Sequence, residues 1–265
     1  MKTDITSERC IGVFDSGVGG LSVLNVLRHR LPHASLVYVG DVAYAPYGER
    51  DTTEVIARCQ RIVAHLVALG AQLIVVACNT ATVLGITALR ERWPALRFVG
   101  VEPGVKPAVS ATRTRRIAVM ATPATAASTR LGYLVDAFAG GVHVHIEPCP
   151  GLAATIERGV HDGPELLAAL APLCASVRAA NVDTVVLGCT HYPFVANAIQ
   201  MLLGDGITLL DTAVPVAERT AALWAADCAD RANLRLLSTG TIAPMERLLR
   251  QCRHLEQVQI EHLPI

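Results

Sequence analysis

Two segments of the chain resemble each other, and each contains a cysteine. Residues 73–82 read Leu-Ile-Val-Val-Ala-Cys-Asn-Thr-Ala-Thr, and residues 184–193 read Thr-Val-Val-Leu-Gly-Cys-Thr-His-Tyr-Pro. Each starts with an apolar run typical of a buried parallel strand and continues into small polar residues that open a helix. Cys78 and Cys189 are therefore predicted at the carboxyl ends of two strands, where open α/β sheets bind ligands. Two thiols facing one cleft suit chemistry on both faces of one substrate.

Either cysteine alone would more often be a buried structural residue, but the repeated context favours a function for both. A helix that begins directly after each cysteine supplies positive potential, so we expect the pKa of both thiols to be lowered. No two cysteines have Cys-x-x-Cys spacing, and a chain of 265 residues needs no disulfides to form a core. The other six cysteines are expected to be small buried hydrophobic residues: Cys10, Cys59, Cys149, Cys174, Cys228 and Cys252.

Two further residues stand where they can exchange protons. His191 follows Cys189 by two positions, so it is either a satisfied buried imidazole or a proton-exchange partner of the thiol. A Cys–His pair also suits nucleophilic hydrolysis. Asp15 opens the turn Asp15-Ser-Gly-Val-Gly-Gly20, which matches neither a dinucleotide-binding fingerprint nor a P-loop. Its carboxylate either caps the next helix or is a charged partner for a thiol or a substrate ammonium group.

Two polar turns are candidates for binding anionic groups of a substrate. The loop from Asp41 to Gly48 is long for a connection inside a compact domain. Its backbone N–H groups and the Tyr47 hydroxyl are expected to bind an anion, unless it is only a rigid surface loop. The turn Thr122-Pro-Ala-Thr125 is either a second anion site or a plain helix N-cap.

Strand-like and helix-like segments alternate along the chain, which predicts an α/β fold of mostly parallel sheets flanked by helices. Because residues 11–15 and 117–121 correspond as the cysteine segments do, we expect two pseudo-symmetric lobes with the active site in the cleft between them. The first lobe is predicted at 1–101, joined by 212–265, and the second at 102–211. Helices are predicted over 193–203 and 214–226, and residues 103–116 receive no helix or strand.

The composition argues against several classes of function. Lys plus Arg equals Asp plus Glu, at 23 each, so no basic surplus points to nucleic acid as the main partner. No apolar run approaches the length of about 18 residues that a membrane span needs, and the polar first residues do not read as a signal peptide. We therefore expect a reduced, cytoplasmic protein that does not associate with membranes.

Taken together, the motifs resemble the glutamate racemases of the aspartate/glutamate racemase superfamily, in order and spacing along the whole chain. The matching motifs are Asp15-Ser-Gly-Val-Gly-Gly, Pro46-Tyr-Gly48, Ala77-Cys-Asn-Thr-Ala-Thr82 and Gly188-Cys-Thr-His-Tyr-Pro193. These isomerases make D-glutamate for bacterial peptidoglycan, and hence for cell shape, without a cofactor or a metal. The resemblance implies that Cys78 serves D-glutamate and Cys189 serves L-glutamate, with Asp15 and His191 as auxiliary acid–base residues. A homodimer is also expected.

The resemblance further implies a set of substrate-binding residues. They are Ser16, Pro46, Tyr47, Gly48, Asn79, Thr80, Thr122, Thr125, Thr190 and, with a less defined role, the acidic Glu157. The chain departs from the family at Pro123, which lacks an N–H and so argues against a main-chain contact there. Three rival functions stay open: a racemase for aspartate or another small acid of the superfamily, a Cys–His hydrolase using Cys189 and His191, and a non-catalytic amino-acid-binding module.

Overall fold

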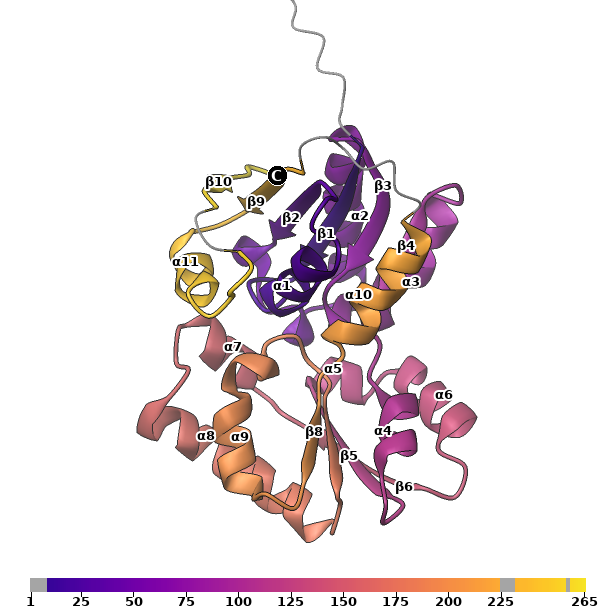
Figure 1. Cartoon of the computed structure of the whole chain (residues 1–265), viewed down its shortest axis with the longest axis vertical. Helices are drawn as coiled ribbons and strands as arrows, with labels where there is room; N and C mark the ends of the chain where they lie inside the picture. The colour runs from indigo at the N-terminus through magenta and orange to yellow at the C-terminus, as the bar shows by residue number, and fades with distance from the viewer. Residues whose placement is uncertain (1–8, 225–231, 256–257) are drawn as a thin grey trace, which may run out of the picture.

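A computed structural model describes residues 9–224, 232–255 and 258–265 of the chain (Figure 1). Two parallel sheets, each flanked by helices, lie one above the other along the long axis of the molecule. This confirms the predicted α/β fold class. The sheet drawn at the top of Figure 1, with its helices, is called the first half below, and the lower sheet with its helices is called the second half.

The first sheet has six strands in the order β10-β9-β2-β1-β3-β4, and its pairings are parallel. Helices cover both of its faces, so strands such as β1 and β2 are buried along their whole length and read as continuous apolar runs. The strands are β1 (Cys10–Asp15), β2 (Leu36–Gly40), β3 (Ala71–Val76), β4 (Arg97–Gly100), β9 (Leu234–Ser238) and β10 (Ile260–His262).

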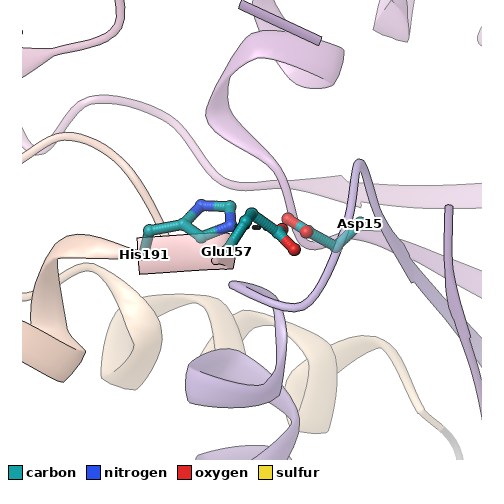
Figure 2. Close-up of side chains that lie close together, drawn as sticks. All are labelled: Asp15, Glu157 and His191. Carbon is teal, nitrogen blue, oxygen red and sulfur yellow. Dashed lines mark hydrogen bonds and ion pairs between the residues drawn. The ribbon is translucent and has the colours of Figure 1, made fainter. Parts of the chain in front are cut away.

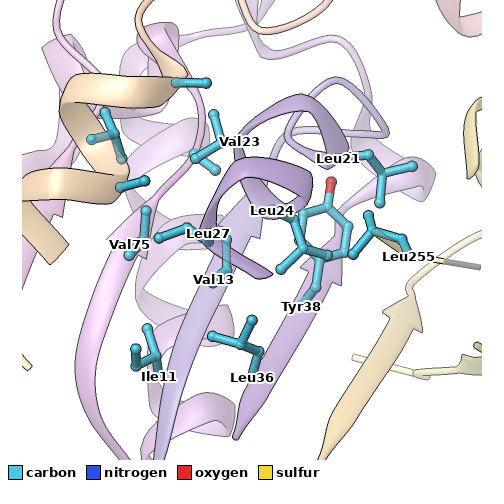
Figure 3. Close-up of a cluster of buried hydrophobic side chains, with 14 of the residues drawn as sticks. Ile11, Val13, Leu21, Val23, Leu24, Leu27, Leu36, Tyr38, Val75 and Leu255 are labelled. Atoms are coloured by element: carbon cyan, nitrogen blue, oxygen red, sulfur yellow. The ribbon is translucent and has the colours of Figure 1, made fainter. Parts of the chain in front are cut away.

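Successive residues of β1 point to opposite faces of this sheet. Ile11 and Val13 belong to the cluster that α1 and α10 cover (Figure 3), whereas Phe14 belongs to the cluster beneath α2 and α3. Fully burying one such side chain contributes about 1.5–3 kcal/mol, so both clusters hold the strand ends firmly. The helices are α1 (Leu21–Arg30), α2 (Thr52–Ala68), α3 (Asn79–Arg92), α10 (Ala213–Leu223) and α11 (Ala243–Leu249), with 3₁₀ turns η1 (Val42–Tyr44) and η2 (Tyr47–Glu49).

The second sheet has four strands in the order β6-β5-β7-β8, also in parallel. Its strands are β5 (Arg116–Ala121), β6 (His143–Pro148), β7 (Thr184–Leu187) and β8 (Thr208–Leu210). Its helices are α4 (Val105–Ala111), α5 (Pro123–Ala126), α6 (Thr129–Phe138), α7 (Leu152–Glu157), α8 (Gly163–Ala179) and α9 (Ala196–Leu203), with the 3₁₀ turn η3 (Tyr192–Val195). Within the described residues, no helix is long and apolar enough to cross a bilayer.

The register places the two cysteines equivalently. Val76 of β3 pairs with the last residue but one of β1, and Leu187 of β7 pairs with the last residue but one of β5. Cys78 follows Val76 by two positions, and Cys189 follows Leu187 by two positions. Both cysteines therefore lie just beyond the carboxyl end of a strand, β3 next to β1 and β7 next to β5. The repeat in sequence is therefore a repeat in structure.

Some elements differ from the sequence predictions. The helix predicted over 193–203 is divided into η3 and α9, because its first turn closes with i→i+3 hydrogen bonds, such as that from the N–H of Phe194 to the oxygen of His191 at 3.1 Å. The helix predicted over 214–226 is observed to Leu223, and its last two residues lie outside the described part. Helix α4 was missed because its seven residues, with a proline inside, carry no clear period. Strand β10 was missed because three residues, two of them exposed, give no strand pattern.

The chain crosses from the first half to the second between β4 and α4, and returns between β8 and α10. Helix α10 packs on α1 and β4, and β9 pairs with β2. Whether independent domains end near residues 101 and 211 stays a prediction.

Candidate active site

Cys78 and Cys189 line one small cavity where the two halves meet. Its free volume is about 10 Å³, close to the 10–15 Å³ that roughly one water molecule needs. The halves are thus closed on each other. Beside the thiols the cavity is lined by Ser16, Pro46, Tyr47, Gly48, Asn79, Thr80, Thr122, Ala153, Thr190 and His191, so Ala153 is the member that sequence reasoning did not single out.

A larger pocket of about 600 Å³ lies at the opposite, amino-terminal edge of the first sheet, beside Trp93 and Trp224. It contains none of the predicted site residues. Because ligands of open α/β sheets bind outside the carboxyl ends of the strands, the smaller cavity is the better candidate for the chemistry.

Cys78 is the N-cap of α3. Its Sγ accepts the main-chain N–H of Ala81 at 3.4 Å and lies 3.4 Å from the hydroxyl of Ser16. Burial raises the pKa of Cys78 to about 12; the nearby Asp15 carboxylate adds to this, and the two hydrogen bonds only partly oppose it. The expected lowering of the pKa by the helix is therefore wrong for Cys78, because desolvation outweighs the helix N-terminus. In the closed structure Cys78 is a protonated thiol at neutral pH.

Cys189 stands beside an imidazole and a carboxylate. Its Sγ lies 3.5 Å from Nδ1 of His191, and Nε2 of His191 lies 2.7 Å from Oε1 of Glu157 (Figure 2). Burial alone would lower the pKa of His191, but the sulfur and the Glu157 carboxylate outweigh it and hold that pKa well above its ordinary value. His191 therefore lies where it can exchange a proton with the thiol.

Asp15 is wholly buried and does not cap a helix. Its carboxylate accepts the N–H of Gly17 at 2.7 Å and the hydroxyl of Thr190 at 3.1 Å, whereas α1 starts only at Leu21 and has no side-chain cap. The capping alternative is thus wrong. Burial raises the pKa of Asp15 to about 6; the charge of His191 lowers it and that of Glu157 raises it.

Asp15, Glu157 and His191 form a compact cluster (Figure 2). One donor atom from each lies within 4.8 Å of the others, a spacing that a cation would accept. Oε1 of Glu157, however, already accepts the N–H of Val18 at 2.8 Å as well as facing the imidazole. Hydrogen bonds across the two halves therefore satisfy this cluster as it stands.

The glycines of the Asp15-Ser-Gly-Val-Gly-Gly turn let the two halves approach. A Cβ on Gly17 would lie 1.9 Å from Oε1 of Glu157, and one on Gly19 would lie 2.5 Å from Nδ1 of His191. A side chain at either position would therefore have to displace Glu157 or His191. The glycines of the turn thus allow the close contact between the halves.

Hydroxyl groups from both halves converge on the other side of the cavity. The Oγ1 atoms of Thr80 and Thr122 lie 3.0 Å apart, and Thr125 is 3.4 Å from Thr80. Thr122 also caps α5, at whose first position Pro123 needs no N–H. Nearby, Oδ1 of Asn79 is buried without a hydrogen-bond partner. An unpaired buried acceptor beside the thiols fits a ligand that brings its own N–H donors.

One predicted contact is different in the structure. The Tyr47 hydroxyl donates to Oδ2 of Asp41 at 2.5 Å, so in this structure its proton is directed to Asp41, and anion binding by the hydroxyl stays a prediction. Asp41 was not predicted as a site residue, although it directly follows β2. Five of the six remaining cysteines are buried as expected, and Cys228 lies outside the described residues.

Residues 22–220 match the family described as Asp/Glu/Hydantoin racemase. The chain belongs to this family. It is 44% identical over 243 residues to a glutamate racemase of Pseudomonas aeruginosa (strain UCBPP-PA14), covering 90% of this chain and 92% of the relative. The chain is therefore grouped with the glutamate racemases, as the sequence motifs predicted.

Solved structures agree with this placement of the racemase chain. A glutamate racemase isoform from Bacillus anthracis superposes with a TM-score of 0.87 at 28% identity, covering 98% of each chain. A glutamate racemase from Escherichia coli, solved with L-glutamate and the activator UDP-MurNAc-ala, gives a TM-score of 0.85 at 32% identity, covering 96% of this chain and 98% of that one.

Proposed function

We propose that the chain interconverts L- and D-glutamate by proton transfer at Cα, with one thiol on each face of the substrate. The observation that carries this proposal is the pair of buried cysteines, at equivalent strand ends, that line one cavity between the halves. Inverting a stereocentre requires a proton to leave from one side and arrive from the other. Two opposed acid–base groups do this without turning the substrate over.

The Cα–H of an amino acid is far less acidic than a thiol, so the carbanion needs stabilisation. Hydrogen bonds to the α-carboxylate and exclusion of water provide it where no electron sink is bound. Since the closed cavity holds about 10 Å³, the halves must separate to admit glutamate and then close over it. We assign Cys78 as the resting acid, in line with its raised pKa, and Cys189 as the resting base. This state accepts L-glutamate, and the reverse state accepts D-glutamate.

The auxiliary and binding roles follow from position. Asp15 acts on the Cys78 side, and His191, held by Glu157, acts on the Cys189 side. The unpaired Oδ1 of Asn79 accepts a hydrogen bond from the substrate ammonium group. The substrate carboxylates are assigned to hydroxyl and main-chain groups of Ser16, Pro46-Tyr47-Gly48, Thr80, Thr122, Thr125 and Thr190.

We further propose that the enzyme works without cofactor or metal, as a cytoplasmic homodimer, and supplies D-glutamate for peptidoglycan. The Cys189–His191–Glu157 arrangement would also suit a cysteine hydrolase. That function leaves Cys78 and the structural repeat without a role. Aspartate and other small acids are the remaining rival substrates, which a substrate panel separates.

The decisive experiment incubates the purified protein with L-glutamate in deuterated water. Optical rotation should fall to zero while the Cα–H signal is lost at a matching rate, and activity should survive chelators and carbonyl reagents. Loss of activity to EDTA with recovery on adding zinc would falsify the metal-free mechanism. Trapping of an acyl-enzyme on Cys189 would favour the hydrolase.

A further inference from the structure

A buried ion pair lies behind the cavity wall and has no part in the proton transfers described above. Asp41 is fully buried and the Arg58 side chain is 4% exposed. Nη2 of Arg58 lies 2.6 Å from Oδ1 of Asp41, and Nε lies 3.0 Å from Oδ2. Desolvating two charges is unfavourable unless geometry and further hydrogen bonds compensate, so a pair placed here calls for an explanation.

The Asp41 carboxylate has a full set of donors. Beside the two bonds from Arg58, Oδ1 accepts the hydroxyl of Thr239 at 2.7 Å and Oδ2 accepts the hydroxyl of Tyr47 at 2.5 Å. Thr239 in turn accepts the N–H of Ala43 at 3.2 Å. The carboxylate therefore joins the start of the 41–48 loop, its end and the turn after β9.

The guanidinium group of Arg58 makes two more contacts from α2. Its Cζ lies over the Tyr44 ring, 3.9 Å from the centroid, and Nη1 donates to the main-chain oxygen of Ile265 at 3.1 Å. One side chain thus touches Tyr44 in η1 directly, reaches Tyr47 in η2 through Asp41, and binds residue 265. The segment holding Ile265 follows β10 and is anchored where the N–H of Leu263 bonds to Ser238 of β9 at 2.7 Å.

The loop held in this way is a wall of the proposed active site. Pro46, Tyr47 and Gly48 line the cavity with the two thiols, and a Cβ on Gly48 would come within 3.0 Å of Thr122 in the second half. Because the Tyr47 hydroxyl proton is donated to Asp41, the loop has main-chain groups to offer a substrate carboxylate rather than that proton. Such groups bind only as well as the loop backbone is positioned.

We propose that Arg58 is a positioning residue of the racemase site, which through Asp41 and Tyr44 fixes the loop from residue 41 to 48 and couples it to the segment around Ile265. This inference rests on the proposed function. It assigns Arg58 and Asp41 an effect on substrate binding rather than on the chemistry of the thiols, since neither lines the cavity. It also explains why the C-terminal strands return to the first sheet, where Thr239 and Ile265 support the loop.

The test is a double-mutant cycle between Arg58 and Tyr47, read in the KM for glutamate well below the midpoint of thermal unfolding. Arg58→Gln should raise KM about tenfold with kcat changed less, as expected when binding rather than chemistry is weakened. Tyr47→Phe should raise KM by a smaller factor. The double variant should resemble Arg58→Gln alone, because both changes release the same loop.

Arg58→Lys keeps the charge but loses the planar two-pronged geometry, so its KM should lie between those of the wild type and Arg58→Gln. Arg61→Gln, exposed on the same helix, is the matched control and should leave KM unchanged. If the Arg58 variants lower only the unfolding temperature and keep the wild-type KM, or if the two single effects multiply in the double variant, the proposal is overturned.

Should Arg58→Gln fail to fold, Arg58→Lys and Tyr47→Phe decide: an unchanged KM in both overturns the proposal. Failure of the proposed function is a separate outcome, since the wild type itself would then not racemise glutamate. Calorimetric titration with glutamate gives a second measure of binding that does not depend on turnover.

Discussion

The two halves of the site share one backbone pattern but differ in the groups that surround each thiol. In the first half β1 ends at Asp15, and in the second half the equivalent strand, β5, ends at Ala121. Two positions after the cysteine the first half has Thr80, whereas the second has His191. In the proposed mechanism the carboxylate serves Cys78 and the imidazole serves Cys189, and neither residue has a counterpart at the equivalent position of the other half.

This difference teaches how a duplicated fold can treat two mirror-image substrates unequally. The enantiomers of glutamate have equal free energies, so kcat/KM must be the same in both directions for the wild type and for every variant. The asymmetry of the halves is then visible only in kcat and KM taken separately, or in reactions that need a single proton transfer. The predictions below use these quantities.

The largest effect is expected from removing either thiol. Cys78→Ser and Cys189→Ser should each lower racemisation by about a thousandfold or more, since general acid–base groups contribute 10²–10⁴-fold and no group remains to complete the inversion. Optical rotation measures this loss. Either variant racemising at the wild-type rate would show that the two-thiol mechanism is wrong.

The same variants also separate the two faces. With β-chloroglutamate, one deprotonation at Cα suffices, because the electron pair expels chloride and the resulting enamine hydrolyses to a 2-oxo acid and ammonia. Cys78→Ser should eliminate chloride from the L-isomer preferentially, and Cys189→Ser from the D-isomer. Chloride release from each isomer measures the preference, and a common preference in both variants would contradict the assignment of faces.

The next largest effect is expected at Asp15. Asp15→Asn should fold and yet lose about a hundredfold in turnover. Both carboxylate oxygens accept hydrogen bonds, which suits the ionised form, so wild-type kcat/KM should fall as the pH drops below the Asp15 pKa of about 6. The variant should lack this limb in its pH profile. Wild-type turnover in the variant would leave Asp15 without a catalytic role.

The raised pKa of Asp15 also has a consequence for stability. Folding disfavours the charged carboxylate, so its contribution is most favourable below the unfolded pKa near 4 and is lost as the pH rises towards about 6. Asp15→Asn should therefore gain stability relative to the wild type between these pH values. Urea unfolding at pH 4 and pH 8 checks the sign of this change.

The strands that position the thiols could be predicted from the sequence, whereas some of the shorter elements could not. Runs such as residues 73–76 are buried on both faces and read as strands without ambiguity. Helix α4 and strand β10 are short, and their places are set by packing and pairing with distant elements. Local pattern carries no information of that kind.

The site divides in the same way. The cysteines and His191 could be predicted because their motifs are local, and Asp15 because it ends a strand. The raised pKa of Cys78 could not be predicted. It comes from the burial of the thiol when the two halves are closed, and this burial outweighs the effect of the helix N-terminus. The contacts of Asp41 could not be predicted either. Tyr47 is 6 positions and Arg58 is 17 positions along the chain from Asp41, and nothing in the residue types at those positions indicates that they meet.

A smaller effect is expected at Glu157, which holds the imidazole of the second half. Glu157→Gln keeps an oxygen for the N–H of Val18 but removes the charge that raises the pKa of His191. We expect about a tenfold loss of kcat in the direction in which Cys189 is the base, and less in the other. Glu165→Gln, whose pair with Arg158 is exposed, is the control. Equal losses of kcat in both directions would contradict the assignment of Glu157 to the Cys189 side.

The smallest effect on activity is expected at Asp183, which stabilises the second half far from the thiols. Its carboxylate accepts the N–H groups of Arg113 and Thr114, each at 2.7 Å, and the hydroxyl of Thr112 at 2.6 Å. Burial opposes ionisation, but these bonds outweigh it and hold the pKa of Asp183 far below its usual range. A depressed pKa stabilises the fold fully above the unfolded value near 4, and the contribution is lost as the pH falls below it.

Asp183→Asn keeps one acceptor oxygen and loses the charge, so it should lower the free energy of unfolding by about 1–2 kcal/mol at pH 7. The difference from the wild type should shrink towards pH 3, because protonation weakens the wild type in the same way. Urea unfolding at the two pH values measures this, with kcat and KM recorded at pH 8. Since the cavity residues are held by contacts between the halves and not by this turn, both kinetic constants should stay at wild-type values. A changed KM would mean that the turn at Asp183 is coupled to the closing of the two halves.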